Sequence, residues 1–296
     1  MSHPHAPPAA DPLALLIRPS PRSIGEFDVL RALPVRECRA VGPFVFFDQM
    51  GPAVLPAGRG LAVRPHPHIG LATVTWLFEG EIRHQDSLGS DVVIRPGEVN
   101  WMTAGSGIVH SERSPEASVG VDAPISGVQV WLALPVEKEE LAPAFAHFDA
   151  EALPCLRWPG LQITLIIGAA WQRRSPVEAH SETLYAEVNM SAGARLLVPD
   201  HIEERAVFVH TGAVLLGGLR HEAGAMLVLQ PGVEAIVDAP GEVKLMLLGG
   251  APLDGERHLF WNFVSSSKER IEQAKDDWRA GRFAKVPGDD EHIPLP

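Results

Sequence analysis

Two short motifs in the chain have the spacing of metal ligands. His66-Pro67-His68 leads into an apolar run, and His110-Ser111-Glu112 follows further along the chain. In an extended strand, residues i and i+2 point to the same face, so each motif can direct two side chains at one point. Three imidazoles and one carboxylate suit a divalent transition metal, and without a thiolate the donor set leaves iron, copper, nickel, manganese and zinc open. We therefore predict four metal ligands: His66, His68, His110 and Glu112.

The remaining histidines provide weaker patterns. A lone HxH or HxE motif often lies on a solvated strand edge, so the prediction depends on the two motifs occurring together. His180-Ser181-Glu182 repeats the second tripeptide, but no HxH partner lies at a comparable spacing, and we interpret it as structural. Seven isolated histidines are interpreted as surface or hydrogen-bonded residues: His84, His147, His201, His210, His221, His258 and His292.

The sequence gives little support for other kinds of catalytic or binding site. The run from Ala104 to Ile108 reads AGSGI, which is not a GxSxG nucleophile motif and lacks the third glycine of a phosphate-binding loop. Cys38 and Cys155 are the only cysteines and neither belongs to a CxxC motif, which excludes a thiolate zinc cluster and a disulfide framework within one chain. This cysteine usage is typical of a reducing compartment.

Composition restricts the partners that we expect. The chain has 296 residues, 46% hydrophobic and 21% charged, with a formal net charge of -12. That charge repels phosphate backbones and anionic lipids, so we expect neither direct nucleic-acid binding nor membrane association. The N-terminal segment has no basic start or long apolar run, and His3 and His5 are typical of a flexible tail. We expect a soluble, cytoplasmic protein.

The elements that must position the ligands are predicted to be short strands. Apolar runs such as LATVTWLFEGEI and GVQVWLALP are separated by Gly and Pro turns, which is typical of a small antiparallel sandwich or barrel. A similar pattern of apolar runs and turns resumes in the second half of the chain. We predict an N-terminal metal-binding domain over 15–135, a linker over 136–158 with a helical turn near its start, a second β domain over 159–260, and a helix and tail over 261–296.

The two halves resemble one another. Gly80 aligns with Gly212, and Pro96-Gly97 with Pro231-Gly232, which indicates a duplicated barrel. The four ligand positions then fall on Val198, Asp200, Leu245 and Leu247. Because three of these are apolar, we predict that the second barrel is structural and binds no metal.

Two further predictions concern packing. Ser266-Ser267-Lys268-Glu269 has the pattern of a capping box, followed by an apolar helical stripe that packs on the barrels. Five large side chains near the motifs are possible pocket residues, but strand alternation favours core packing for each: Phe44, Phe46, Trp76, Trp101 and Met102.

With these residues in place, the sequence resembles the pirin family of the cupin superfamily. The resemblance rests on GPFVFFDQMGP, RPHPHIGLATVTWLFEGEIRHQDSLGS and RPGEVNWMTAGSGIVHSERS, and runs from about Arg18 to the tail. It implies an all-β fold of two tandem antiparallel cupin (jelly-roll) barrels with a C-terminal helix, and one iron, most often Fe(II), on His66, His68, His110 and Glu112. Bacterial members are similar to quercetin 2,3-dioxygenases, and nuclear members to metal-dependent transcriptional co-regulators.

The sequence departs from general cupins at two places. Ala72 and Thr73 stand where a glutamate usually follows HxH, and Ser114 stands where the second motif usually has asparagine. The carboxylate must therefore come from Glu112, as the resemblance to pirins implies.

Three functions remain open from the sequence. The first is a dioxygenase that uses O2 to open a flavonol-type (quercetin-like) or related hydroxy-ketone, with Glu112 as the catalytic proton acceptor. The second is a non-enzymatic metal- or redox-sensing regulatory protein that binds a protein partner. The third is an isomerase or other metal-assisted enzyme, because cupin barrels host many chemistries.

Overall fold

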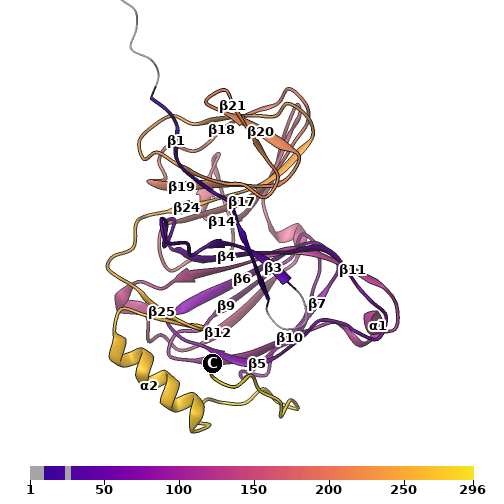
Figure 1. Ribbon diagram of the computed structural model, residues 1–296, viewed down its shortest axis with the longest axis vertical. Helices are drawn as coiled ribbons and strands as arrows, with labels where there is room; N and C mark the ends of the chain where they lie inside the picture. Colours follow the sequence, from indigo (N-terminus) through magenta and orange to yellow (C-terminus); the bar gives the residue numbers. More distant parts are fainter. Residues whose placement is uncertain (1–9, 24–27) are drawn as a thin grey trace, which may run out of the picture.

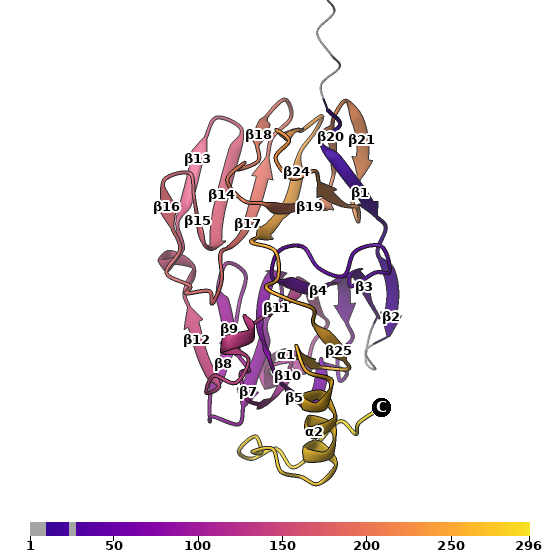
Figure 2. The ribbon, with the colours of Figure 1, turned by 90° about the vertical axis from the view of Figure 1, so that its left-hand side faces the viewer.

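The computed structural model describes residues 10–23 and 28–296, and its elements form two stacked β-barrels (Figures 1 and 2). The predicted all-β bicupin fold is confirmed. His3 and His5 lie outside the described residues. Within the described ranges, no helix is long and apolar enough to cross a membrane.

The first barrel consists of two antiparallel sheets. The seven-stranded sheet has the order β12 (Ala144–Phe148), β9 (Val99–Thr103), β6 (Leu71–Glu79), β11 (Ala123–Ala133), β4 (Phe44–Leu55), β3 (Asp28–Leu33) and β2 (Ser20–Ser23). The four-stranded sheet has the order β5 (Ala62–His68), β10 (Ile108–Arg113), β7 (Ile82–Asp86) and β8 (Asp91–Ile94). A short helix, α1 (Glu116–Val119), precedes β11.

The second barrel repeats this plan. Its seven-stranded sheet has the order β1 (Leu13–Ile17), β22 (Met226–Leu229), β19 (Glu204–Thr211), β24 (Val243–Gly250), β17 (Thr183–Met190), β14 (Leu161–Ile167) and β13 (Cys155–Trp158). Its four-stranded sheet has the order β18 (Arg195–Leu197), β23 (Ile236–Asp238), β20 (Ala213–Leu216) and β21 (Leu219–Glu222). A small hairpin, β15 (Ala169–Ala170) and β16 (Arg173–Arg174), lies beside them.

The two seven-stranded sheets share a core between the barrels. Phe44 lies 5.4 Å from Tyr185 and Phe47 lies 4.7 Å from Phe208, as measured between ring centroids. Strand β6 has buried apolar side chains on both of its faces. Trp76 packs into this shared core, whereas Leu77 belongs to a separate cluster in the first barrel. Since successive strand residues point to opposite faces, alternation along β6 supplies both cores.

Several segments cross the predicted domain boundaries, β1 and β12 among them. Strand β1, which holds residues 15–17, pairs with β22 of the second barrel, and β12, inside the predicted linker, pairs with β9 of the first. The predicted helical turn in this linker is a 3-10 turn at Val136–Lys138, and a second one lies at Ala150–Ala152. Edge strands need partners for their backbone groups, which explains why connecting segments are drawn into the sheets.

One half of the internal alignment was wrong. Gly80 and Gly212 do occupy equivalent turns, β6–β7 and β19–β20. In contrast, Pro96-Gly97 joins β8 to β9, whereas Pro231-Gly232 joins β22 to β23, so the two turns are not equivalent.

The sheet order therefore makes β10 equivalent to β23, not to β24. On the equivalent strands of the second barrel, Val237 of β23 lies opposite Leu196 of β18. Both of these side chains are buried and apolar. The absence of metal from the second barrel stays a prediction, and it now rests on these two residues.

The C-terminal segment returns to the first barrel. It contains the hairpin β25 (His258–Phe260) and β26 (Phe263–Ser265), followed by α2 (Lys268–Arg279), which lies below the first barrel in Figure 1. The predicted capping box is not formed, because the N-cap lies one residue later and the N3 position is then Arg270, not Glu269. Ser267, not Ser266, is the N-cap and accepts from the Arg270 N–H, because Ser266 is occupied by Glu139. Ile271 and Ala274 are buried on the predicted helix face.

Candidate metal centre

Three of the predicted ligands converge inside the first barrel. His66 and His68 lie two residues apart on β5, and β10 places His110 directly opposite His66. All three imidazoles are buried, and each offers a ring nitrogen within 4.8 Å of the other two. A single divalent ion could be held at this point by three neutral nitrogen donors.

The hydrogen bonds around two of the rings leave their Nε2 atoms free for a metal. The Nδ1 of His66 lies 2.9 Å from the carbonyl oxygen of Arg64, which can only accept, so this Nδ1 carries the proton. His110 Nε2 lies 3.1 Å from His68 Nε2. Nitrogen lone pairs that face one another at this distance are favourable when a cation lies between them, so the donor set fits a metal.

A buried chain behind His110 sets the proton position on its ring. His84 Nε2 lies 3.0 Å from a carboxylate oxygen of Asp86, which can only accept, so His84 donates there, and the neutral tautomer that does so has a bare Nδ1. That Nδ1 lies 3.3 Å from His110 Nδ1, which therefore donates. The other Asp86 oxygen accepts the backbone N–H groups of Leu88 and Ser90. The chain leaves the lone pair of His110 on Nε2.

This outer chain was missed from the sequence, where His84 was interpreted as isolated. His84-Gln85-Asp86 has the same i, i+2 spacing as the two recognised motifs, and this spacing could have revealed it. Strand β7 pairs with β10 so that Asp86 lies opposite His110. The ring of His84 stacks on Phe145, with 4.4 Å between centroids.

We expect His84→Phe to weaken metal binding. Phenylalanine can keep the stack on Phe145 but cannot accept from His110, and loss of such an outer partner typically costs about 10–100-fold in metal affinity. A competition titration with a chromophoric chelator measures the dissociation constant. His210→Phe is the matched control, because His210 is similarly buried but stacks on Phe78 near the second barrel. Equal affinities for the two variants would contradict this role of His84.

Burial keeps the three imidazoles neutral. It lowers the pKa of His66 from 6.5 to about 4, against the hydrogen bond with the Arg64 carbonyl, which acts in the opposite direction. Burial and then the neighbouring histidines lower the pKa of His68 and His110 well below the ordinary value. A metal requires unprotonated imidazoles, so the site is ready to bind at neutral pH.

These pKa shifts predict acid sensitivity of the metal-free protein. Between pH 4 and 6.5 the unfolded chain binds protons that the folded chain does not, so the free energy of unfolding should fall as pH drops through this window. Each histidine contributes a slope of about 1.4 kcal/mol per pH unit. Urea unfolding from pH 7 to 4.5 measures it, and His66→Gln should flatten the slope, whereas replacing the exposed His201 should not. A pH-independent stability would contradict the shifts.

Glu112 lies in the same cavity but outside the histidine group. Among the described residues, the 4.8 Å group contains no carboxylate. Strand β5 carries one extra residue between its pairings with His110 and Glu112, which bends β5 at this point. Gln129 Nε2 donates to Glu112 Oε1 at 3.4 Å, and burial raises the pKa of the Glu112 carboxyl. A raised pKa brings a carboxylate closer to the range of a general base at neutral pH.

A cavity of about 360 Å³ gives access to the site. Phe46 and Trp131 stack in its wall with centroids 3.8 Å apart, so Phe46 is a cavity residue, which corrects its prediction as core packing alone. Phe44, Trp76, Trp101 and Met102 are buried in the cores, as predicted. Arg31 also lines the cavity and forms two hydrogen bonds with Asp48, at 2.8 and 2.7 Å. The wall therefore contains aromatic rings, with Phe46 lying between Trp131 and Arg31, and its cation, Arg31, is already paired with Asp48.

The other histidines lie elsewhere. His180 Nε2 is 3.0 Å from the Thr103 hydroxyl, and its motif lies apart from the metal-ligand group, which fits its structural interpretation. His147, predicted as isolated, lies near two carboxylates at the surface, those of Glu98 and Asp149.

Comparisons with known proteins agree with this architecture. The Pirin family model matches residues 26–132, and the model of the Pirin C-terminal cupin domain matches residues 185–284. A pirin-like protein of Caulobacter vibrioides is 47% identical over 280 residues, covering 93% of this chain and 96% of that protein.

Comparisons with solved structures also agree with this architecture. A protein described as quercetin 2,3-dioxygenase from Acinetobacter baumannii is 33% identical, with a TM-score of 0.88 and coverage of 95% of this chain and 94% of its own. A bacterial pirin from Escherichia coli, crystallised with nickel(II), shares the fold with a TM-score of 0.64 at 19% identity, covering 81% of this chain and 99% of its own. On the shared motifs, the two matched domains and the near full-length similarity, this chain belongs to the pirin family.

Proposed function

We propose that this protein is a metal-dependent dioxygenase that opens a flavonol-type substrate or a related vicinal hydroxy-ketone with O2. The observation that carries the proposal is the convergence of three buried, neutral imidazoles beside a partly aromatic cavity. The similarity to the quercetin 2,3-dioxygenase of Acinetobacter baumannii supports the substrate class. Iron(II) is the first candidate metal, and copper, nickel, manganese and zinc are the alternatives.

The residues around the cavity have separate roles in this proposal. His66, His68 and His110 would hold the ion, which lowers the pKa of a hydroxyl group bound to it. Phe46 and Trp131 give the cavity an aromatic wall, and the paired Arg31–Asp48 group, which covers the other face of Phe46, offers hydrogen bonds without an excess positive charge. We assign Glu112 as the base that takes the hydroxyl proton, since it lies in this cavity with a raised pKa.

Loss of that proton makes the substrate an electron-rich enolate. The enolate supplies the electrons that O2 accepts when the ring is cleaved. Both oxygen atoms enter the product, so no external reductant is needed.

Oxygen uptake tests the proposal. Protein purified without added ions is first analysed for metal by mass spectrometry, and protein loaded with each candidate metal is then supplied with a panel of flavonols in an oxygen electrode. Uptake matched to flavonol loss is expected. Stoichiometric metal with no uptake for any flavonol would overturn the proposal. Turnover without oxygen would indicate a metal-assisted isomerase instead.

A further inference from the structure

A strained hairpin from the far C-terminal region forms part of the wall of the metal cavity. Phe260 of β25 pairs with Phe263 of β26, so Trp261 and Asn262 form a two-residue turn. Both turn residues line the cavity that also contains His66 and His68. Trp261 has a φ of 52°, in the left-handed region that large side chains rarely adopt.

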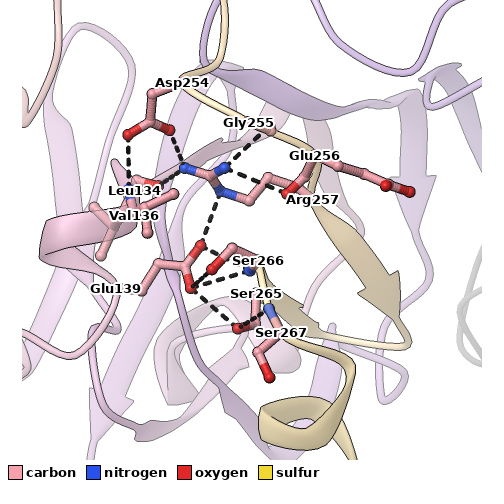
Figure 3. A network of polar contacts seen from close by, with 10 residues as sticks. All are labelled: Leu134, Val136, Glu139, Asp254, Gly255, Glu256, Arg257, Ser265, Ser266 and Ser267. Atoms are coloured by element: carbon pink, nitrogen blue, oxygen red, sulfur yellow. Dashed lines mark hydrogen bonds and ion pairs between the residues drawn. The ribbon is translucent and has the colours of Figure 1, made fainter.

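This hairpin is held at both of its ends by one buried carboxylate, Glu139 (Figure 3). Before β25, Arg257 forms an ion pair with Glu139 at 2.9 Å, and both side chains are buried. After β26, the hydroxyl of Ser265 and the backbone N–H of Ser266 donate to Glu139 at 3.0 and 2.9 Å. Asp254 also pairs with Arg257 and accepts the N–H of Val136. A single acid therefore fixes the hairpin where its strands begin and end.

The hairpin also docks directly beside the ligands. The N–H of Val264 donates to the carbonyl oxygen of Ile69, the residue after His68. Gly70 permits this approach, since it has a φ of 67° and a Cβ at this position would lie 2.0 Å from the carbonyl oxygen of Val264. The tip thus has a fixed position relative to the histidine group.

Strain of this kind persists only where the surroundings impose it, and it is concentrated at functional sites. Glycine or asparagine would fit the Trp261 backbone at lower cost. The indole packs against Phe263 and Trp278, with centroids 5.6 and 6.3 Å away, so it joins the hairpin to α2 as well as lining the cavity. The chain holds the strained residue with a buried ion pair and directs it to the cavity that contains the candidate metal centre.

We infer that Trp261 and Asn262 are specificity-determining residues that contact the substrate, and that Glu139 is the positioning residue that holds them against the metal cavity. This inference rests on the proposed function for its ligand class. The indole of Trp261 adds a third aromatic group to the Phe46–Trp131 wall, and the amide of Asn262 adds one donor and one acceptor for ring hydroxyls.

The first experiment compares Trp261→Gly with Trp171→Gly. Trp171 is the matched control, because it also lies in a two-residue turn, between β15 and β16, with a φ of 48°, and it is partly buried against the core of the second barrel. Nickel(II)-loaded protein is titrated with quercetin without oxygen. We expect Trp261→Gly to weaken quercetin binding about tenfold with an unchanged metal content, and Trp171→Gly to leave binding unchanged. Equal binding by both variants would overturn the role of Trp261.

The second experiment compares Glu139→Gln with Glu140→Gln and needs no substrate. Glu140 is the neighbouring residue and forms an exposed ion pair with Arg270 of α2. The readout is the rate at which EDTA removes nickel(II) from the loaded protein. Breaking the buried pair should loosen the hairpin and raise this rate about tenfold or more, whereas Glu140→Gln should leave it unchanged. Equal rates would overturn the positioning role of Glu139.

The two tests separate this inference from the proposed function. If no flavonol is consumed, the dioxygenase assignment fails, but quercetin binding by Trp261→Gly and nickel release from Glu139→Gln still test the hairpin. Thermal unfolding of each pair identifies general destabilisation. If quercetin binding by Trp261→Gly and nickel release from Glu139→Gln both match the wild type while the wild type oxidises flavonols, the dioxygenase stands and the hairpin inference fails.

Discussion

Replacing Glu112 with glutamine is expected to lower kcat for flavonol oxidation by about 10²–10⁴-fold while leaving the metal in place. Glutamine has nearly the same shape and can keep the contact with Gln129, but its amide cannot take a proton from the substrate. The three imidazoles are unaffected because they form their 4.8 Å group without this carboxylate. Steady-state kinetics and metal analysis of the same preparation measure the two properties.

This experiment separates two roles for Glu112. The sequence motifs predict a fourth ligand, whereas the cavity geometry favours a base beside the metal. If Glu112→Gln loses its metal together with its activity, the carboxylate is a required ligand and its assignment as a base is not supported. Glu187→Gln is the control, because Glu187 is also a buried acid but accepts from the Trp76 indole between the barrels. This control should retain both properties.

The histidine pairs were predictable because strand alternation is a local property. Side chains two residues apart on β5 share a face, and the spacing alone indicates it. The pairing that places His110 opposite His66 is a long-range property. The joint occurrence of the two motifs and the resemblance to a known family predicted that they meet, but not the strand register. The extra residue in β5, which separates the surroundings of Glu112 from those of the imidazoles, has no clear signal in the sequence.

The hairpin at Trp261 marks the limit of prediction from the sequence. Its residues lie far along the chain from the ligands, beyond a complete second barrel. The text before α2 suggests a strand-like segment, but not that it returns to the first barrel. That return depends on Glu139, a buried acid in a segment interpreted as a linker, which pairs with Arg257 across the fold. Charged residues are mostly exposed to solvent, so the sequence does not indicate that these two are buried and paired. Only the structure shows this ion pair.

The duplicated architecture shows a related limit. Matching the Pro-Gly turns gave a plausible alignment of the two halves of the chain. However, Pro96-Gly97 follows β8 and Pro231-Gly232 follows β22, and these two strands are not equivalent. Pro-Gly pairs favour a turn wherever a strand ends, so their chemistry does not identify which strand it is. The ladder of paired strands identifies it, and on the strands equivalent to β5 and β10 it pairs Leu196 with Val237, which both lie in the apolar core.

Replacing His110 with alanine is expected to remove both the metal and the activity. His110 is the link between the two parts of the centre, since its Nε2 lies 3.1 Å from His68 and its Nδ1 lies 3.3 Å from His84. The substitution deletes one of three donors and also disconnects the Asp86–His84 chain. The loss of affinity should therefore exceed the roughly 10–100-fold that removal of an outer partner alone produces. Metal content after purification without added ions, and oxygen uptake with a flavonol, measure the outcome.

The control for this variant is supplied by the chain itself. His180 begins the same His-Ser-Glu tripeptide, but its ring contacts Thr103 and lies apart from the metal-ligand group, so His180→Ala should keep full metal content and turnover. A His110→Ala protein that still binds one equivalent of metal at wild-type affinity would show that the three imidazoles are not the ligands. If it instead lost turnover but kept the metal, His110 would act on the substrate and the centre would need another donor. Only joint loss, with His180→Ala intact, supports one coordination centre built from β5 and β10.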